Sequence, residues 1–168
     1  TASPSETRDI EHRLRRLDTL SDFILLDTGY GHSANAIRFG MVADEFIEVT
    51  TTSLSANAES FAIIRMLHDV DPDVKVSLVV NRANSLSEAR EAFARINGSA
   101  HKVGIGEVPS MGWVAEDDSM RQFMVRGEAI VEAMPNSPAA KCISRLADYL
   151  SNRLTPIVRR NTGPMLAL

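Results

Sequence analysis

The sequence predicts an α/β fold with three layers, in which helices cover both faces of a mostly parallel, doubly wound sheet. Short apolar stretches alternate with helical stretches of about 8–15 residues, which is typical of right-handed βαβ units. Residues 23–26 are apolar at every position, as expected for a strand buried inside a parallel sheet. The 168 residues, 44% of them hydrophobic, suit one domain, which we expect over residues 1–154 with an irregular tail at 155–168.

Helices are expected where a capping signal precedes apolar residues at helical spacing. Ser3-Pro4-Ser5-Glu6 and Ser85-Leu86-Ser87-Glu88 both have the form of a capping box, and Ser137-Pro138 is a third helix start. Gly127 is a typical helix terminator. The predicted helices cover residues 3 to about 20, a short stretch from 33, 58–67, 85 to about 97, 118–126, and 137 to about 154.

Strands are expected where short apolar or β-branched runs lie between turn residues. Asp71-Pro72-Asp73 is such a turn, and Pro109 separates two further short runs. The predicted strands cover residues 23–27, 46–51, 74–80, 101–107 and 111–114.

Composition excludes several classes of protein and of site. The net charge of −4 argues against a surface that coats nucleic acid. Cys142 is the only cysteine, so an internal disulfide and a cysteine-based zinc site are excluded, and we expect it to be a small apolar residue on a helix face. The four histidines lack metal-ligand spacing. The sequence has no apolar run of about 18 residues and no signal peptide, so a cytoplasmic location is expected.

Asp27 is the first candidate site residue, because it follows the apolar strand directly. A carboxylate at the carboxyl end of such a strand points into the crevice where open α/β sheets bind ligands, and in nucleotide hydrolases it serves the magnesium ion. Gly29 and Gly31 would let the backbone approach a phosphate closely. The alternative is a buried strand that simply ends in an Asx turn.

The 168 residues contain no Gly-x-x-x-x-Gly-Lys-Ser/Thr phosphate loop, and a predicted helix precedes the first predicted strand. A doubly wound nucleotide domain normally begins with a strand that leads into that loop. We therefore expect a sheet that lacks its first strands, and an exposed edge that favours self-association.

Five motifs in order resemble a known family. They are Asp27-Thr28-Gly29-Tyr30-Gly31, Ala43-Asp44-Glu45-Phe46-Ile47, Val79-Val80-Asn81-Arg82, Gly112-Trp113-Val114-Ala115-Glu116-Asp117 and Met134-Pro135-Asn136-Ser137-Pro138-Ala139-Ala140. Over roughly residues 10–152 the chain resembles the carboxyl-terminal two-thirds of MinD/ParA-type deviant P-loop ATPases. Within that group it is most similar to the flagellar-number regulators of the FlhG type. The resemblance implies a P-loop NTPase-like sheet.

The resemblance also implies roles for individual residues. Asp27 matches the Walker B aspartate, which orients Mg²⁺ through its waters, and Gly29 and Gly31 match the switch II turn. Asn81 matches the residue that binds the adenine edge, with Arg82 beside the base, although a polar turn is the alternative there. The loop that closes over the adenine corresponds to Val114, Ala115, Glu116 and Asp117.

Several departures from the family pattern bear on activity. The Walker A loop with its signature lysine is missing from the sequence, and so is switch I. Tyr30 and His32 stand where the family has smaller residues, and Ala115 replaces a proline. Both expected cofactors, ATP and Mg²⁺, need the missing loop, so we expect this chain alone to be inactive, either as a fragment or as a relative that has lost part of its apparatus.

The resemblance implies a switch ATPase that places or counts a cellular structure such as flagella, cycling between a monomer and an ATP-bound homodimer. Its expected partners are a second copy and proteins of the positioning or flagellar machinery. A non-catalytic interaction scaffold of the same fold is one alternative. A ParA-type DNA-segregation ATPase is another, which the acidic balance disfavours.

Peripheral membrane contact is a further expectation with weak support. Residues around the last helix form a faint basic-amphipathic pattern, which Pro156 interrupts, so a frayed helix end is the preferred interpretation. The residues concerned are Leu150, Arg153, Leu154, Ile157, Val158, Arg159 and Arg160.

Overall fold

The fold is an α/β sandwich around a parallel sheet, seen in a computed structural model that describes residues 12, 14, 17, 21–29, 34–154 and 165–167. Within these described residues, five strands form one sheet in the order β1-β5-β2-β3-β4, and every neighbouring pair is parallel. The strands are β1 (Ile24–Leu26), β2 (Glu45–Thr50), β3 (Val76–Ala83), β4 (Ser110–Ala115) and β5 (Met165–Ala167).

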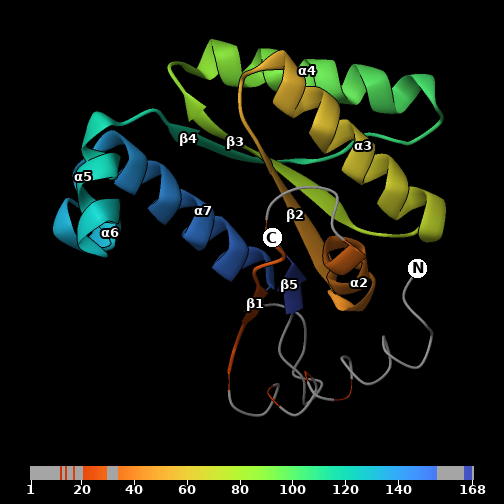
Figure 1. The fold of residues 1–168 in the computed structure, drawn as a ribbon, viewed down its shortest axis with the longest axis horizontal. Coiled ribbons are helices and arrows are strands. Elements are labelled where there is room, and N and C mark those ends of the chain that lie inside the picture. The colour runs from red at the N-terminus through yellow and green to blue at the C-terminus, as the bar shows by residue number, and fades with distance from the viewer. Residues whose placement is uncertain are drawn as a thin grey trace.

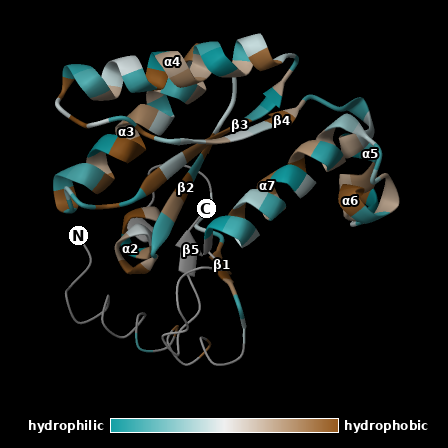
Figure 2. Ribbon diagram, turned by 180° about the vertical axis from the view of Figure 1, so that it is seen from behind, coloured by the Kyte–Doolittle hydropathy of each residue, from teal (hydrophilic) through white to brown (hydrophobic). Residues whose placement is uncertain are grey.

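Helices cover both faces of this sheet, so the predicted three-layer fold is confirmed (Figure 1). The helices are α2 (Ala34–Val42), α3 (Leu54–Val70), α4 (Leu86–Lys102), α5 (Asp118–Arg126), α6 (Ile130–Ala133) and α7 (Pro138–Leu154). α2, α3 and α4 pack on one face, and α7 with α5 and α6 packs on the other. Apolar and hydrophilic residues alternate around α3, α4 and α7 (Figure 2), as expected for helices with one buried side.

Alternation along β2 and β3 divides the core between the two faces. Phe46 and Leu78 point to the face of α3 and α4, where they join Ile64, Leu67 and Ile96 in the largest buried cluster. Successive side chains of a strand point to opposite faces, so the next residue of each strand lies on the other side.

That other side is the face covered by α7. Ile47 and Val79 meet Ala139 and Ala140 there. Small residues let the helix approach the sheet closely. At Gly112 of β4, a Cβ atom would lie 2.8 Å from Leu146 Cδ2, and the φ angle of +147° also favours glycine.

Most predicted elements match the structure in type and order. The Ser85 hydroxyl accepts from Glu88 N at 3.2 Å at the start of α4, and the Ser137 hydroxyl accepts from Ala140 N at 3.2 Å at the start of α7. Gly127 ends α5 in the left-handed conformation with φ 68°. Cys142 is buried on α7, as expected.

The structure differs from the predicted secondary structure in one strand and one helix. The strand expected over residues 101–107 does not form, because α4 continues through Gly98 to Lys102 and buries Ile96 and Ala100 in the core. The short helix α6 was not expected. The helix expected over residues 3–20 lies almost entirely outside the described residues, as does Gly31.

The tail expected to be irregular contains strand β5. It lies between β1 and β2, where Ala167 is aligned with Leu26 on one side and with Phe46 on the other. β1 and β2 are consecutive in sequence and are connected through α2, but they are not adjacent in the sheet, and β5 occupies the place between them. Pairing there satisfies backbone groups that a buried parallel strand would otherwise leave without partners.

Candidate functional site

The predicted site residues that the structure describes lie at the carboxyl edge of the sheet. Because all strands are parallel, Asp27 after β1, the end of β3 and the loop after β4 meet at this one edge. β1 and β3 are three strand spacings apart, which is about 14 Å. The edge therefore holds two separate groups of candidate residues.

The first group is the turn after β1. Asp27 is exposed, and its Oδ1 accepts a hydrogen bond from Gly29 N at 2.9 Å. Gly29 has φ +73°, a left-handed conformation that favours glycine. This is the Asx turn that the sequence left as the alternative to a magnesium site. A carboxylate has lone pairs on two oxygens, so the turn is compatible with an added water-bound Mg²⁺.

A cavity of about 380 Å³ lies beside this turn. Thr28 and Gly29 form one wall, and β2 with the first turns of α3 forms the others. Hydroxyl groups dominate its polar lining, together with the carboxyl groups of Glu48 and Glu59, and no Lys, Arg or His of the described chain lines it. The cavity therefore offers a phosphate group no cationic side chain from the described residues.

Glu48 is the buried carboxyl group of this cavity, with only 7% of its surface exposed. Burial raises the pKa of Glu48 to about 7, and a hydrogen bond from the Ser60 side chain partly opposes the rise. Glu48 thus changes its charge close to neutral pH. A carboxyl group of this kind in a cavity is a candidate functional residue.

The loop that follows β2 is anchored by a polar network. Asn57 of α3 is buried, and its Nδ2 donates to Thr51 O at 2.6 Å. Arg95 of α4 donates from Nε to Asn57 Oδ1 at 2.8 Å and from Nη2 to Thr52 O at 3.0 Å. α4 therefore fixes a loop that lines the cavity.

The second group of candidate residues joins the ends of β3 and β4. Arg82 Nε lies 2.8 Å from Glu116 Oε2, and Arg82 Nη2 lies 3.3 Å from Glu116 Oε1. This two-point bond raises the pKa of Arg82 and lowers that of Glu116. Arg82 has φ 58°, which is uncommon for a residue with a side chain. The strain occurs where the two predicted adenine loops meet.

Asp117 caps two helices. Its Oδ1 accepts from Ser119 N at 3.1 Å at the start of α5, and its Oδ2 accepts from Ala139 N at 3.2 Å in the first turn of α7. Hydrogen bonds from the Ser119 side chain and then the Ala139 amide lower the pKa of Asp117. The cap fixes the shape of the loop after β4.

The remaining predicted residues of this group lie beside that loop. Asn81 is half-buried near the end of β3, Val114 is buried in β4 and Ala115 is half-buried at its last position. The nucleotide-binding roles of this group stay predictions.

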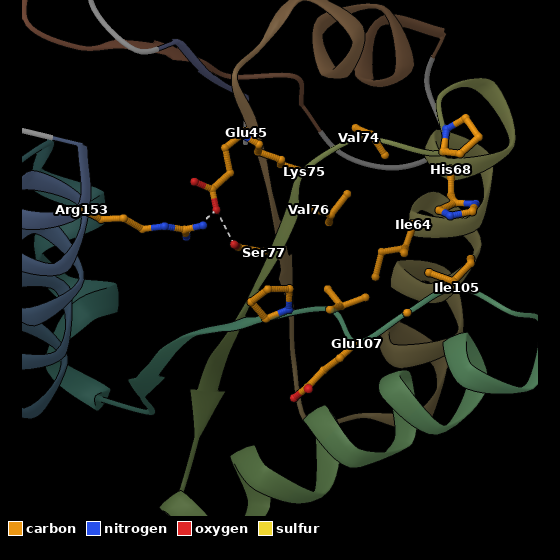
Figure 3. A pocket seen from close by; sticks show the side chains of 14 residues that line it. Glu45, Ile64, His68, Val74, Lys75, Val76, Ser77, Ile105, Glu107 and Arg153 are labelled. Atoms are coloured by element: carbon orange, nitrogen blue, oxygen red, sulfur yellow. Dashed lines mark hydrogen bonds and ion pairs between the residues drawn. The ribbon is translucent and has the colours of Figure 1, made fainter. Parts of the chain in front are cut away.

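A second cavity, of about 260 Å³, opens at the opposite, amino edge of the sheet (Figure 3). Glu45 points into it from the start of β2 with 4% of its surface exposed. Arg153 of α7 places Nη1 2.8 Å from Glu45 Oε1, and the Ser77 hydroxyl donates to the same oxygen. Arg153 and half-buried Leu150 therefore face the protein, which argues against the membrane pattern in this part of α7.

The sequence analysis missed several of these residues. Glu48 lies inside the strand expected over residues 46–51 and Glu45 directly precedes it, and a carboxyl group between apolar strand residues was an available signal. Asn57 and Arg95 gave no signal, because they are 38 positions apart and meet only in the fold. Among the described residues, no group of three His, Cys, Asp or Glu side chains is placed to hold a metal ion, and no helix is long and apolar enough to cross a membrane.

Comparison with curated proteins finds two informative relatives. The chain is 23% identical over 131 residues to the antiactivator FleN of Pseudomonas aeruginosa, which covers 78% of this chain and 47% of FleN. It is 26% identical over 141 residues to an uncharacterised ATP-binding protein of Methanocaldococcus jannaschii, which covers 84% of this chain and 50% of the relative. The chain thus spans about half the length of these relatives. No family model matches the sequence.

Solved structures show the same fold. The septum site-determining protein MinD of Pyrococcus horikoshii, solved with Mg-ADP, aligns with a TM-score of 0.69 and 20% identity over 92% of this chain and 60% of that chain. The MinC:MinD cell division complex of Aquifex aeolicus aligns with a TM-score of 0.70 and 21% identity over 91% of this chain and 62% of that chain. The sequence relatives support the resemblance to MinD/ParA-type P-loop ATPases that the motifs predicted, and the solved MinD structures show the same fold.

Proposed function

We propose that this chain forms part of an ATP-dependent switch of the MinD/FlhG class that places or counts a cellular structure, with flagella as the first candidate. The observation that carries the proposal is that the Asp27 turn and the Arg82–Glu116 corner lie at the same, carboxyl edge of a parallel sheet. Ligands of open α/β sheets bind at this edge. FleN is named as an antiactivator, which supports a regulatory role.

Mg-nucleotide would lie along this edge. The adenine would be held near Asn81 and Arg82, under the loop formed by Val114, Ala115, Glu116 and Asp117. Asp27 would orient the hydrated Mg²⁺, and the amides of Gly29 and Gly31 would contact the terminal phosphate. Mg²⁺ supplies charge neutralisation of the phosphates when bound. The cavity beside Asp27 presents two carboxyl groups and no cation from the described residues, so the cationic phosphate ligand has to come from outside them.

Partners are proposed on the same basis. One solved neighbour is a MinD protein in complex with MinC, and FleN is an antiactivator. We therefore propose a protein partner from a positioning or flagellar system, together with the homodimer that the family resemblance implies. A non-catalytic scaffold is the second candidate, because the lining of the cavity repels phosphate. A DNA-segregation ATPase is disfavoured by the net charge of −4.

A nucleotide-binding measurement and the upstream coding sequence test the proposal. Calorimetric titration of the 168-residue chain with Mg-ATP should show no measurable binding, and a low-micromolar dissociation constant would require an unrecognised phosphate site. The coding sequence upstream of Thr1 decides between the two candidates. A Lys-Gly-Gly-x-Gly-Lys-Thr loop there would support the ATPase, and its absence would favour the scaffold.

In a form that carries such a loop, Asp27→Ala should abolish ATP hydrolysis and leave the fold intact. Asp22→Ala is the matched control, because Asp22 is also exposed but precedes β1 instead of following it. Equal turnover in both variants would show that Asp27 serves only its Asx turn.

A further inference from the structure

The cavity at the amino edge of the sheet lies away from the described residues of the proposed function. It opens where β2 and β3 begin, whereas the Asp27 turn and the Arg82–Glu116 corner lie at the carboxyl edge. Its volume of about 260 Å³ is just below the range of about 300–1,000 Å³ that is usual for small-molecule sites. A ligand of this cavity is therefore a small metabolite, and its binding does not rest on the proposed function.

The cavity has a polar end and an apolar end (Figure 3). The polar end is formed by Glu45, Ser77 and Arg153, on the face of the sheet that α7 covers. The apolar end lies on the opposite face and is lined by aliphatic side chains, which are those of Ile64, Val76, Ile105 and Val108. Ligand sites commonly combine such an apolar lining with a few polar groups that fix orientation. This cavity fits a ligand with a short aliphatic part and a polar head.

The ion pair at the polar end can bind further charged groups. Arg153 Nη1 lies 2.8 Å from Glu45 Oε1, and the Ser77 hydroxyl donates to the same oxygen. Both of these bonds fall on Oε1, and a carboxylate can accept more at its second oxygen. A guanidinium has five N–H donors, of which the bond to Glu45 uses one. The pair can therefore bind an ammonium group at Glu45 Oε2 and a carboxylate at Arg153 at the same time.

The charges that line the cavity balance each other. Among the described lining residues, Lys75 and Arg153 are cations, and Glu45 and Glu107 are carboxylates. His68 also lines the cavity, and an ordinary histidine is mostly neutral at pH 7. A lining of this kind favours a ligand that carries both charges over an anion or a cation, because each charge of the ligand then has an opposite partner.

We propose that this cavity binds a free aliphatic α-amino acid such as leucine. The ammonium group of the ligand binds Glu45 Oε2, and its carboxylate binds Arg153 and Lys75. Its aliphatic side chain lies against Ile64 and Val76. A peptide terminus carries only one of the two charges, so it would leave one of these partners without a counter-charge. The ligand bridges β2, α3 and α7, so its binding stabilises the folded chain.

Four probes test the proposal in NMR titrations of the 168-residue chain. Leucine should bind saturably, with a dissociation constant of about 1 mM or lower, and should shift the amide signals of Val76, Ser77 and Ile105. Leucinamide lacks the carboxylate, isocaproate lacks the amino group and glycine lacks the aliphatic side chain. Each of these three should bind at least about tenfold more weakly than leucine.

The same titrations can overturn the proposal in three ways. Equal binding of leucine and leucinamide would assign the cavity to the amino terminus of a peptide. Equal binding of leucine and isocaproate would assign it to a simple carboxylate. Absence of saturable leucine binding would exclude an amino-acid site. None of these results depends on nucleotide binding at the carboxyl edge, so the two proposals fail separately.

Two variants assign the charges of the ligand to residues. Lys75→Gln removes an exposed cation, so it should weaken leucine binding by about three- to fivefold and leave leucinamide binding unchanged. Lys102→Gln, exposed on α4 and outside the cavity lining, is the matched control.

Glu45→Gln keeps the size of the side chain and an oxygen that can accept from Ser77, but it removes the negative charge. It should weaken binding of leucine and leucinamide about tenfold or more and leave isocaproate binding unchanged, with circular dichroism confirming the fold. Leucine binding that is the same in Lys75→Gln, Glu45→Gln and the parent chain would overturn the site.

Discussion

Arg153, in the last turn of α7, places Nη1 2.8 Å from Oε1 of Glu45, the first residue of β2. The two residues are 108 positions apart in sequence. Glu45 is buried, whereas the Arg153 side chain is 37% exposed. The arginine thus compensates a carboxylate that has little contact with water.

Removal of this arginine should destabilise the protein. Arg153→Ala leaves the buried Glu45 carboxylate without its cation, and we expect the free energy of unfolding to fall by about 2–3 kcal/mol in urea titrations. Arg65→Ala is the control, because its pair with Asp69 is exposed on α3 and should cost less than about 0.5 kcal/mol. Equal losses in the two variants would contradict the burial argument.

Glu48 should make stability depend on pH. The pKa of Glu48 is raised to about 7 in the folded protein from its ordinary value of 4.5, so the folded chain holds this proton where the unfolded chain has lost it. The contribution of Glu48 is therefore fully present below pH 4.5 and is lost as pH rises to about 7, by on the order of 3 kcal/mol.

Glu48→Gln should remove this part of the pH dependence, measured by urea unfolding at pH 5 and pH 8. Glu128→Gln, at an exposed position after α5, should retain it. A Glu48→Gln protein that loses as much stability as the parent between these pH values would place the effect elsewhere.

Asn57 should stabilise the loop after β2 more than it stabilises α3, the helix in which it lies. Asn57→Ala removes the bonds to Thr51 O and to Arg95 Nε, and we expect a loss of about 2 kcal/mol together with faster hydrogen exchange at Thr51 and Thr52. Arg90→Ala, exposed on the same helix as Arg95, should change neither quantity. Unchanged loop exchange in Asn57→Ala would mean that other bonds hold the loop.

Because the sheet has an open edge, we expect the chain to self-associate at micromolar concentration. The exposed Leu25 lies on edge strand β1, so Leu25→Lys should shift the sedimentation coefficient toward that of a monomer. Leu86→Lys, a comparable exposed leucine at the start of α4, should leave association unchanged. A parent chain that sediments as a monomer would show that β5 and the short β1 close the sheet sufficiently.

Local signals in the sequence predicted much of the fold. Helix α5 runs from Asp118 to Arg126 as expected, because a capping residue and Gly127 mark both ends. Gly98 was misread as a helix end, although the helical spacing of Ile96 and Ala100 continues past it. A three-residue strand such as β5 has too few residues to show a period, so only the gap between β1 and β2 reveals its place.

Part of the candidate site could also be predicted from the sequence, and part could not. Asp27 and the Arg82–Glu116 corner follow strands that the sequence marks clearly, so their common edge could be predicted. The charge state of Glu48 could not, because it arises from burial of the side chain in the folded protein.

Helix α7 is fastened at both ends to residues that belong to opposite edges of the sheet. Its first turn donates from Ala139 N to Asp117, and its last turn holds Glu45 through Arg153. Seventeen helical residues span about 25 Å. Between these points Leu146 packs against Gly112 too closely for a Cβ atom. The helix therefore connects the loop after β4 to the mouth of the cavity at the amino edge through contacts at both of its ends.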